Sequence, residues 1–207
     1  SQLDGVALVS NSDAHSPNPW RLGREANVFE LGRLSYGEVF DSIRKKDASR
    51  FLFTIEVDPA YGKYHYTGHK KCGVSLAPAE ARRIGDKCPK CGRKLTVGVL
   101  ERVEELADRP EGYMPQGAVP YKRLLPLYEV ISHATGVNRL YNKGVMDEQD
   151  RLIRTFGSEL AVLLEADREA LAATTKGGIA DAIIAVREGR VEVVPGYDGV
   201  YGIPVFR

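Results

Sequence analysis

The hydrophobic pattern in the first quarter of the chain predicts a strand, a helix and a second strand. Residues 6–10 form a short apolar run that predicts a buried strand, and residues 36–46 place their apolar side chains on one helical face. Residues 50–57 are rich in phenylalanine and β-branched residues, which favours another strand. A strand, helix, strand order predicts a parallel βαβ unit.

Helical periodicity dominates the middle of the chain. It covers residues 101–108, residues 123–134 and the long stretch 147–165, in which Leu152, Phe156 and other apolar residues form a stripe that should face the core. Gly136 marks a predicted break between the second and third of these helices.

The C-terminal part predicts a helix pair and a hairpin. Residues 168–173 and 179–188 are helical in pattern and are joined by a glycine-containing turn. Residues 191–194 and 200–206 read as two strands around Asp198-Gly199, a dipeptide that favours tight hairpin turns.

Composition indicates a folded protein. The chain has 207 residues and 43% hydrophobic content, enough for one large or two to three small units. It has no apolar run long enough to span a bilayer and no signal-peptide pattern, so we expect a cytoplasmic protein without membrane contact. The sequence does not begin with methionine and opens almost directly into an apolar run, which suggests a piece of a longer protein.

The three cysteines of the chain fall into one short, polar stretch. His69 and Cys72 form an H-x2-C pair, and after fifteen residues Cys88 and Cys91 form a C-x2-C pair. This is the spacing of a zinc ribbon, in which two knuckles each supply two ligands to a structural Zn²⁺. His65 is an alternative fourth ligand. The ordinary alternative to a zinc site is that the three cysteines are unrelated buried thiols.

The charge around these cysteines is strongly positive. Between residues 63 and 94 there are nine lysines and arginines, among them Lys70 and Lys71, and two carboxylates, whereas the whole chain has a net charge of +1. Such an asymmetry is expected of a patch that faces nucleic acid. A solvated surface on a small ribbon would give the same composition.

A short polar motif follows the first predicted strand. In an extended segment Asp13 and His15 would point to the same side, where a carboxylate and an imidazole are suitable ligands for a catalytic divalent metal. Arg21 and Arg24 in the same loop could bind a phosphate. The plainer roles are a loop cap for Asp13 and surface ion pairs with Glu25 or Glu30 for the arginines.

These motifs resemble known families. Residues 10–16 (SNSDAHS), followed by residues 20–25 (WRLGRE), resemble the last metal motif of the PHP phosphoesterase superfamily. Residues 62–73, 88–99 and 195–202 (PGYDGVYG) resemble the endonuclease Q family, so that the resemblance covers nearly the whole chain in order.

The resemblance implies a three-part molecule. The expected fold class is α/β plus α: part of a PHP domain, a distorted β/α barrel, in residues 1–58, a zinc ribbon in 59–99, and a mainly helical region with a terminal β-hairpin in 100–207. Members of the family nick DNA on the 5′ side of deaminated bases or abasic sites. By this resemblance Asp13 and His15 would bind catalytic Mg²⁺, Mn²⁺ or Zn²⁺. Because the His-x-His strand of such barrels does not precede Ser1, the chain resembles a C-terminal portion that would be inactive alone.

Further residues are candidates for DNA contact. The turn between the predicted helices of residues 168–188 resembles a helix-hairpin-helix module, whose N–H groups bind a backbone phosphate, although packing alone also joins helices through glycines. Tyr197 or Tyr201 could stack on a displaced base, although an aromatic residue in a turn is more often a core residue. The full set of predicted DNA contacts is Arg21, Arg24, Lys70, Lys71, Lys176, Gly177, Gly178 and Tyr197. Two other functions remain open: a non-catalytic zinc-containing nucleic-acid-binding module and a PHP-type phosphatase of small molecules.

Overall fold

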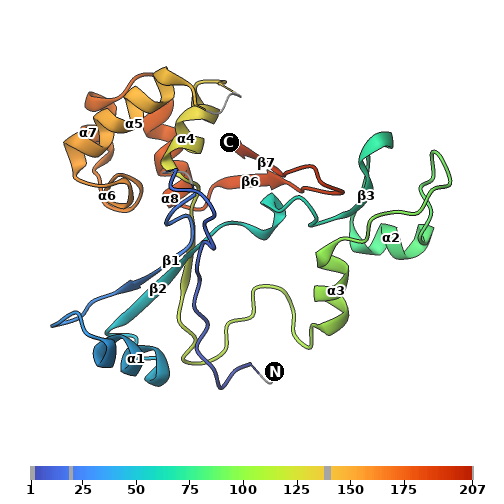
Figure 1. The fold of residues 1–207 in the computed structure, drawn as a ribbon, viewed down its shortest axis with the longest axis horizontal. Helices are drawn as coiled ribbons and strands as arrows, with labels where there is room; N and C mark the ends of the chain where they lie inside the picture. Colours follow the sequence, from blue (N-terminus) through green and yellow to red (C-terminus); the bar gives the residue numbers. More distant parts are fainter. Residues whose placement is uncertain (1–2, 19–20, 138–140, 207) are drawn as a thin grey trace. The chain divides into compact units, whose positions relative to one another are not determined.

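The computed structural model describes residues 3–18, 21–137 and 141–206, so Trp20 of the predicted PHP-like motif lies outside the described residues (Figure 1). Short sheets alternate with helices, as expected of a mixed α/β protein. The elements in chain order are β1 (Ala26–Phe29), α1 (Tyr36–Lys45), β2 (Phe51–Glu56), η1 (Pro59–Tyr61), β3 (Thr67–His69), η2 (Lys70–Cys72), β4 (Val74–Leu76), α2 (Pro78–Ile84), α3 (Val99–Leu106), β5 (Tyr121–Arg123), α4 (Leu127–Ala134), α5 (Lys143–Phe156), α6 (Glu159–Leu164), α7 (Arg168–Thr174), α8 (Ile179–Arg187), β6 (Val191–Val194) and β7 (Ile203–Phe206).

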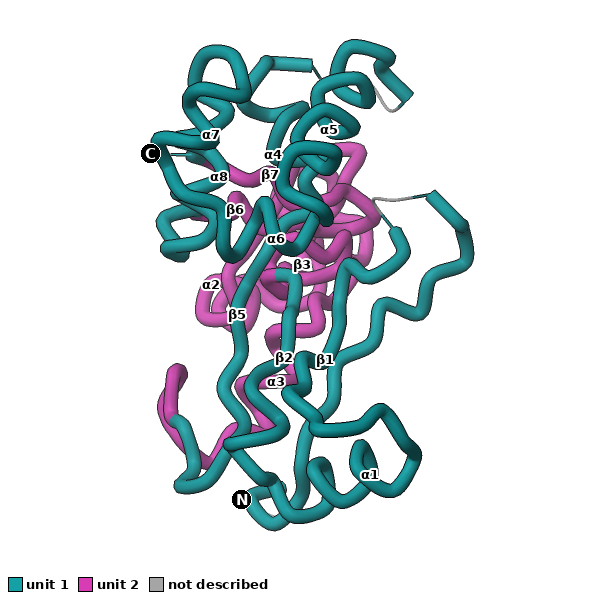
Figure 2. Tube along the Cα trace, turned by 90° about the vertical axis from the view of Figure 1, so that its left-hand side faces the viewer, with its two compact units in different colours: residues 1–57, 114–191, 206–207 teal, residues 58–113, 192–205 magenta. Residues whose placement is uncertain are grey.

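The chain packs into two compact units (Figure 2). Unit 1 contains residues 1–57, 114–191 and 206–207, and unit 2 contains residues 58–113 and 192–205. Each unit is therefore assembled from segments far apart in the sequence. The three-part division at residues 58 and 99 describes expected roles and stays a prediction.

Unit 1 contains a three-stranded sheet in the order β1-β2-β5. β1 pairs with β2 in antiparallel register, with Ala26 opposite Ile55, and β2 pairs with β5 in parallel register, with Thr54 opposite Tyr121. The prediction of a parallel βαβ unit around α1 was therefore wrong. The strand before α1 is β1, which returns directly beside β2, and the parallel partner of β2 follows much later in the chain.

The predicted buried strand at residues 6–10 does not form. Val6, Leu8 and Val9 are about half exposed. The segment is tied to β1 by one side chain: the amide of Asn27 donates to the Ser10 carbonyl at 2.7 Å and its oxygen accepts from the Ser10 N–H at 3.0 Å. A short apolar run becomes a strand only when a neighbouring strand takes its backbone hydrogen bonds.

The predicted helix at residues 36–46 is confirmed as α1. The Ser35 hydroxyl accepts from the Glu38 N–H at its start, and Lys46 ends it in the left-handed conformation. The predicted long helix at 147–165 is instead two helices, α5 and α6. Gly157 has φ of +93°, and the Ser158 hydroxyl starts α6 by accepting from the Ala161 N–H at 3.1 Å.

Helices α4 to α8 pack around a shared apolar core in unit 1. The predicted helix at 123–134 begins later than expected, at Leu127 after Pro126, because residues 121–123 form β5. The predicted helix pair is confirmed as α7 and α8, and the predicted hairpin as β6 and β7. Within the described residues, every helix is too short or too polar to cross a lipid bilayer. The core side chains of these helices include Leu127, Val130, Ile131, Leu152, Val162, Leu163, Leu171 and Ile183.

Candidate metal centre and nucleic-acid surface

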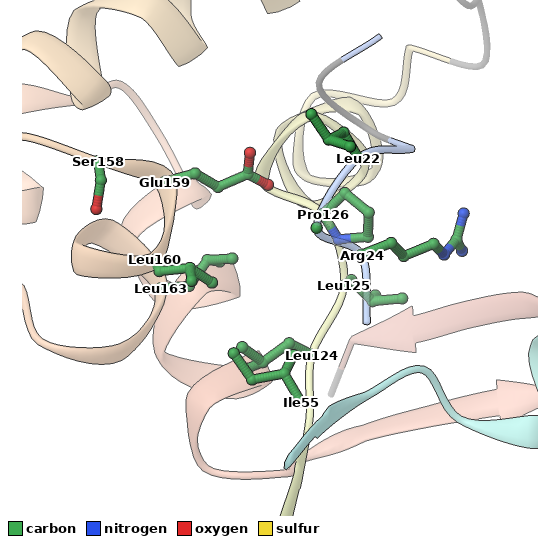
Figure 3. A pocket seen from close by; sticks show the side chains of 11 residues that line it. Leu22, Arg24, Ile55, Leu124, Leu125, Pro126, Ser158, Glu159, Leu160 and Leu163 are labelled. Carbon is green, nitrogen blue, oxygen red and sulfur yellow. The ribbon is translucent and has the colours of Figure 1, made fainter. Parts of the chain in front are cut away.

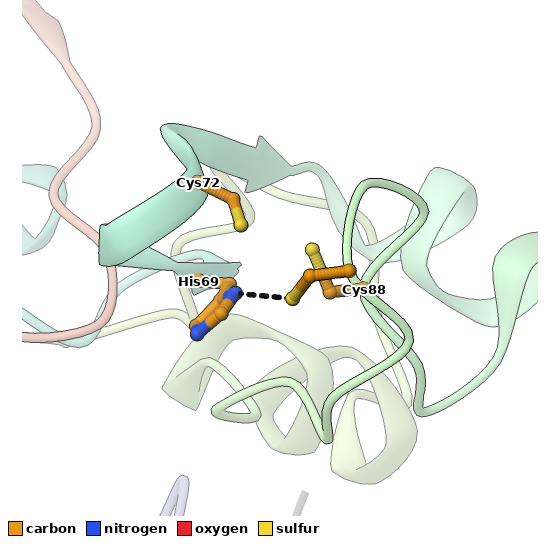
Figure 4. Close-up of side chains that lie close together, drawn as sticks. His69, Cys72 and Cys88 are labelled. Atoms are coloured by element: carbon orange, nitrogen blue, oxygen red, sulfur yellow. Dashed lines mark hydrogen bonds between the residues drawn. The ribbon is translucent and has the colours of Figure 1, made fainter.

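Unit 2 brings the four predicted zinc ligands together. The ligand atoms of His69, Cys72, Cys88 and Cys91 all lie within 4.8 Å of one another (Figure 4). His69 ends β3, Cys72 ends η2, and the other two cysteines flank a tight loop. The imidazole Nδ1 of His69 lies 3.3 Å from the Cys91 sulfur. The H-x2-C and C-x2-C pairs therefore converge on one point, as their spacing predicted.

Local backbone geometry forms both knuckles. Gly73 closes the first knuckle with φ of +59° and donates from its N–H to the Lys70 carbonyl at 3.1 Å. Gly92 closes the second with φ of +70° and donates to the Cys88 carbonyl at 2.8 Å. Glycine suits both positions because it adopts positive φ without steric cost. Beneath the knuckles, Cys88 packs with the buried side chains of Val74 and Leu95.

The surroundings of two cluster cysteines shift their pKa values in opposite directions. Burial acts to raise the pKa of Cys88, but hydrogen bonds from the Lys90 N–H, from His69 and from Cys91 favour its thiolate and lower the pKa to about 6. A hydrogen bond with Cys91, together with burial, raises the pKa of Cys72 to about 11. A bound metal ion would favour the thiolate form of all three cysteines.

The geometry of the cluster fits a tetrahedral zinc ion. Four atoms placed about 2.3 Å from a common centre are separated from one another by roughly 3.8 Å, so ligand atoms within 4.8 Å of one another need to move little. His65 is not a member of the cluster. Its ring stacks on Tyr66 at 5.3 Å, and burial lowers its pKa. The geometry therefore favours His69 over His65 as the fourth ligand.

Asp13 and His15 are not surrounded by further metal ligands within the part of the chain that the structure describes. Among the described residues, the cluster in unit 2 is the one group of three or more potential ligands. Asp13 adopts φ of +43°, so the simple alternation of an extended strand does not apply, and the His15 Nδ1 contacts the Asp13 carbonyl at 2.8 Å. Both residues are exposed. Their assignment to a catalytic metal stays a prediction.

The two arginines of the N-terminal loop lie in different surroundings. Arg21 is exposed. The Arg24 guanidinium pairs with both carboxylate oxygens of Glu129, at 3.0 and 3.4 Å, rather than with Glu25 or Glu30. This ion pair gives Arg24 a structural role inside unit 1, which competes with its predicted contact to a phosphate.

The glycine turn between α7 and α8 is exposed on unit 1. Gly177 and Gly178 have φ of +31° and +47°, and Lys176 beside them faces solvent. A polar cavity of about 600 Å³ adjoins this turn and is lined by Gly178, Arg168 and Arg190 among others. The turn is open to a ligand, and its role in binding DNA stays a prediction.

The tyrosines near the metal cluster differ in exposure. The Tyr197 ring packs against Gly68, where an added Cβ would lie 2.6 Å from the ring, so this tyrosine has a packing role. Tyr201 and Tyr64 are about half exposed, and the Lys63 ammonium lies 5.9 and 5.4 Å from their ring centroids. We did not single out Lys63 and Tyr64 from the sequence, because only folding brings them beside Tyr201. Lys70 and Lys71 are exposed on η2 in the same unit.

Unit 1 also contains an apolar cavity of about 350 Å³ (Figure 3). Its walls include Ile55, Leu124 and Leu163, and the Glu159 carboxyl group points into it. One oxygen of Glu159 accepts from the Leu127 N–H at 2.7 Å, at the start of α4. Burial raises the pKa of Glu159, and the nearby Glu129 acts in the same direction. Nothing in the sequence pointed to this buried carboxyl group, which lies inside the helix predicted for residues 147–165.

Comparison with known proteins extends these observations. A family model described as the MJ0043 C-terminal domain matches residues 126–190, which hold α4 to α8. Protein MJ0043 of Methanocaldococcus jannaschii is 36% identical over 203 residues, and protein YqxK of Bacillus subtilis is 32% identical over 203 residues. These matches cover 97% and 98% of the chain but only 26% and 47% of the two relatives. The chain thus spans less than half the length of either.

Solved structures match the fold as well as the sequence. The lesion-specific endonuclease PfuEndoQ from Pyrococcus furiosus is 38% identical, with a TM-score of 0.88, over 99% of the chain and 50% of its own length. A complex of endonuclease Q with a 27-mer duplex substrate, which holds an abasic lesion at its active site, is 37% identical, with a TM-score of 0.84, over 100% of the chain and 51% of its own length. In sequence and in fold, the chain therefore resembles one half of an endonuclease Q, consistent with the C-terminal portion that its motifs predicted.

Proposed function

We propose that this chain is the DNA-binding and zinc-containing portion of a DNA-repair endonuclease that nicks the phosphodiester backbone 5′ to deaminated bases or abasic sites. The observation that carries this proposal is the match to endonuclease Q over at least 99% of the chain at 37–38% identity. PfuEndoQ is a lesion-specific endonuclease, and the second solved structure holds duplex DNA with an abasic lesion at the active site. The half of those chains that this chain does not cover would be needed for cleavage.

In this proposal the four-ligand cluster holds a structural Zn²⁺. The ion would fix the two knuckles of a small unit that has little apolar core of its own. The basic residues of the ribbon, including Lys70 and Lys71, would lie along the phosphate backbone, and so would Lys176 at the glycine turn. Arg21 is the better candidate of the two loop arginines, because Arg24 is paired with Glu129.

Asp13 and His15 would contribute a carboxylate and an imidazole to the catalytic site of the intact enzyme. A divalent ion such as Mg²⁺, Mn²⁺ or Zn²⁺ bound there would supply a Lewis acid and a water of lowered pKa. The exposure of both side chains in this chain leaves them accessible to ligands contributed by the other half. A damaged nucleotide would have to leave the base stack, which costs least where pairing is already weak.

Binding measurements test the proposal on the chain itself. The chain would be titrated against labelled DNA duplexes at about 50 and about 200 mM salt. The duplexes differ at one position, which holds an abasic analogue, a uracil or a normal base. We expect binding that weakens at higher salt, together with no strand cleavage. A folded chain that binds none of the duplexes at either salt concentration would contradict the proposal and favour the phosphatase alternative.

A further inference from the structure

The loop at residues 195–202 carries a motif whose role the proposed function does not explain. It forms the tight turn of the β6–β7 hairpin, in which Tyr197 and Val200 exchange backbone hydrogen bonds of 2.9 and 2.8 Å. Asp198 and Gly199 between them have φ of +42° and +83°. Two successive residues with positive φ are the signature of a tight hairpin turn, and Asp-Gly is a favoured pair for it.

Backbone hydrogen bonds attach this loop to the segment that leads into the ribbon. Gly196 donates to the Ala60 carbonyl at 2.8 Å and accepts from the Tyr66 N–H at 2.9 Å, and Gly202 donates to the Tyr61 carbonyl at 3.0 Å. An added Cβ at Gly196 or Gly202 would lie 2.4 Å from a backbone oxygen. The two glycines are therefore required by close backbone approach, and the loop is fixed relative to the ribbon.

From this fixed loop, the Asp198 carboxylate connects the two halves of the ribbon. Its Oδ2 accepts from the backbone N–H of Lys70 at 2.6 Å, and its Oδ1 accepts from the Thr96 hydroxyl at 2.6 Å. Lys70 lies inside the first knuckle, between His69 and Cys72. Thr96 follows the second knuckle and pairs with the strand that ends in His69.

The Lys70 N–H would otherwise lack a side-chain partner at the start of η2. His69 occupies the N-cap position of η2 and makes no capping hydrogen bond with its side chain, which instead faces the cysteines. A carboxylate from a distant part of the chain takes over this role. The hydrogen bonds from Thr96 and then Lys70 lower the pKa of Asp198, so that the group is ionised at neutral pH and its hydrogen bonds are charge-assisted.

We infer that Asp198 is a positioning residue of the metal centre: by holding the Lys70 N–H and the Thr96 hydroxyl, it keeps the first knuckle in the geometry that binds the ion. The inference rests on the proposal that the cluster binds zinc, and it does not depend on nuclease activity. Asp198 contacts neither the ion nor DNA in this role. Its effect is to slow opening of the His69–Cys72 knuckle and therefore release of the metal.

Zinc release tests this role. The zinc-loaded chain would be mixed with excess chelating dye, and the release rate of wild type compared with those of Asp198→Ala, Asp198→Asn and Thr96→Val. We expect roughly tenfold or faster release for Asp198→Ala, a smaller increase for Asp198→Asn, which keeps one acceptor oxygen, and a small increase for Thr96→Val. Because both side chains act on one knuckle, the double variant should release zinc little faster than Asp198→Ala alone.

A matched control and a second readout separate positioning from general instability. Asp86→Asn removes another ribbon carboxylate, one whose side chain makes no hydrogen bond to either knuckle, and should leave the release rate unchanged. The absorbance of the Co²⁺-loaded chain reports the ligand geometry directly, and it should change with Asp198→Asn even if Asp198→Ala fails to fold. Wild-type release rates together with an unchanged cobalt spectrum in Asp198→Asn would overturn the inference. A wild-type chain that binds neither ion would overturn it as well.

Discussion

Arg24 and Glu129 form a bidentate ion pair that joins the N-terminal loop of unit 1 to α4. The guanidinium nitrogens lie 3.0 and 3.4 Å from the two carboxylate oxygens, and both side chains are only 15% exposed. In its degree of burial this pair is intermediate between two classes. Exposed ion pairs contribute about 0–1 kcal/mol to stability, and disrupting a buried ion pair costs about 3–5 kcal/mol.

Arg24→Ala should therefore lower the free energy of unfolding by about 1–3 kcal/mol, because Glu129 would remain largely buried without this partner. Urea unfolding measures the change. Arg21→Ala, in the same loop but exposed, is the control and should change the free energy by less than about 0.5 kcal/mol. Equal stability of the Arg24→Ala variant and wild type would show that the pair contributes nothing to the fold.

The buried carboxyl group of Glu159 should make stability depend on pH. Burial raises the pKa of Glu159 in the folded chain. Its contribution to the free energy of unfolding is therefore fully present below the usual pKa of glutamate, and it is lost as pH rises through the folded-state pKa. Glu159→Gln keeps an oxygen for the Leu127 N–H and removes the charge. We expect this variant to melt at a higher temperature than wild type near pH 7 and to lose that advantage near pH 4.

Thermal melts between pH 4 and 8 would show this difference. Glu159→Ala is the control, because it removes both the charge and the acceptor for the Leu127 N–H, and it should gain less at pH 7. If the melting temperatures of Glu159→Gln and wild type run parallel across the whole range, the carboxyl group does not titrate in a buried site.

Zinc should be essential for the ribbon but not for unit 1. One ion per chain is expected, and Cys88→Ser should abolish its binding, since Cys88 is both a cluster member and part of the small core below it. His65→Ala should retain the ion. Elemental analysis measures the metal, and limited proteolysis after treatment with a chelator should cut within residues 58–113 first. Protein purified without chelators that contains no zinc would rule out the metal site.

Tyr64 and Tyr201 should contribute to binding of DNA that has an unstacked base. Each replacement by alanine should weaken binding by about 1–3 kcal/mol, the usual range for a base stacked on an aromatic ring. Fluorescence anisotropy with a duplex containing a single uracil, whose base can leave the stack, measures this. Tyr113→Ala is a matched control, because Tyr113 is 51% exposed, against 45% for Tyr64 and 54% for Tyr201, and also lies beside a cation, Arg109. Equal losses in all three variants would remove the stacking role.

The catalytic roles of Asp13 and His15 can be tested in a longer protein. In it, this chain is joined to a segment that corresponds to the other half of the solved endonucleases. Alanine at either position should reduce strand cleavage by roughly a thousandfold or more while the ribbon zinc and DNA binding persist. Asp41→Ala, an exposed carboxylate on α1, is the control. Replacing a residue that only caps a loop would lower stability by at most about 2 kcal/mol and leave turnover intact. Cleavage near the wild-type rate by Asp13→Ala would therefore exclude Asp13 from the mechanism.

Local signals in the sequence were sufficient for several elements. The helix at α1, the paired helices α7 and α8, the hairpin turn at Asp198-Gly199 and the two metal knuckles each depend on residues close together in the chain, so their patterns predicted them. The family resemblance rested on the same local motifs.

Most of the incorrect predictions concern pairing between distant segments. The helix predicted at residues 147–165 is the exception, because it breaks at a local signal, Gly157 followed by Ser158. β5, at residues 121–123, is a strand because it lies beside β2, and its sequence Tyr-Lys-Arg shows no strand pattern of its own. Residues 6–10 have the opposite property, a strand pattern without a paired neighbour in the described structure. The partners of Arg24 and Asp198 were likewise hidden, since they lie 105 and up to 128 residues away.

The distance between Lys70 and Asp198 also sets an order of events during synthesis. A ribosome that adds about 5–20 residues per second needs roughly 6–25 s to pass from the first knuckle to the carboxylate that holds it. All four cluster residues are made well before Asp198, and the hydrogen bonds of Asp198 can form only once that part of the chain has emerged. If the cluster binds zinc as proposed, the nascent ribbon would expose its thiols before Asp198 can hold the first knuckle. Oxidation of the thiols or binding of another metal would compete with zinc binding during that period.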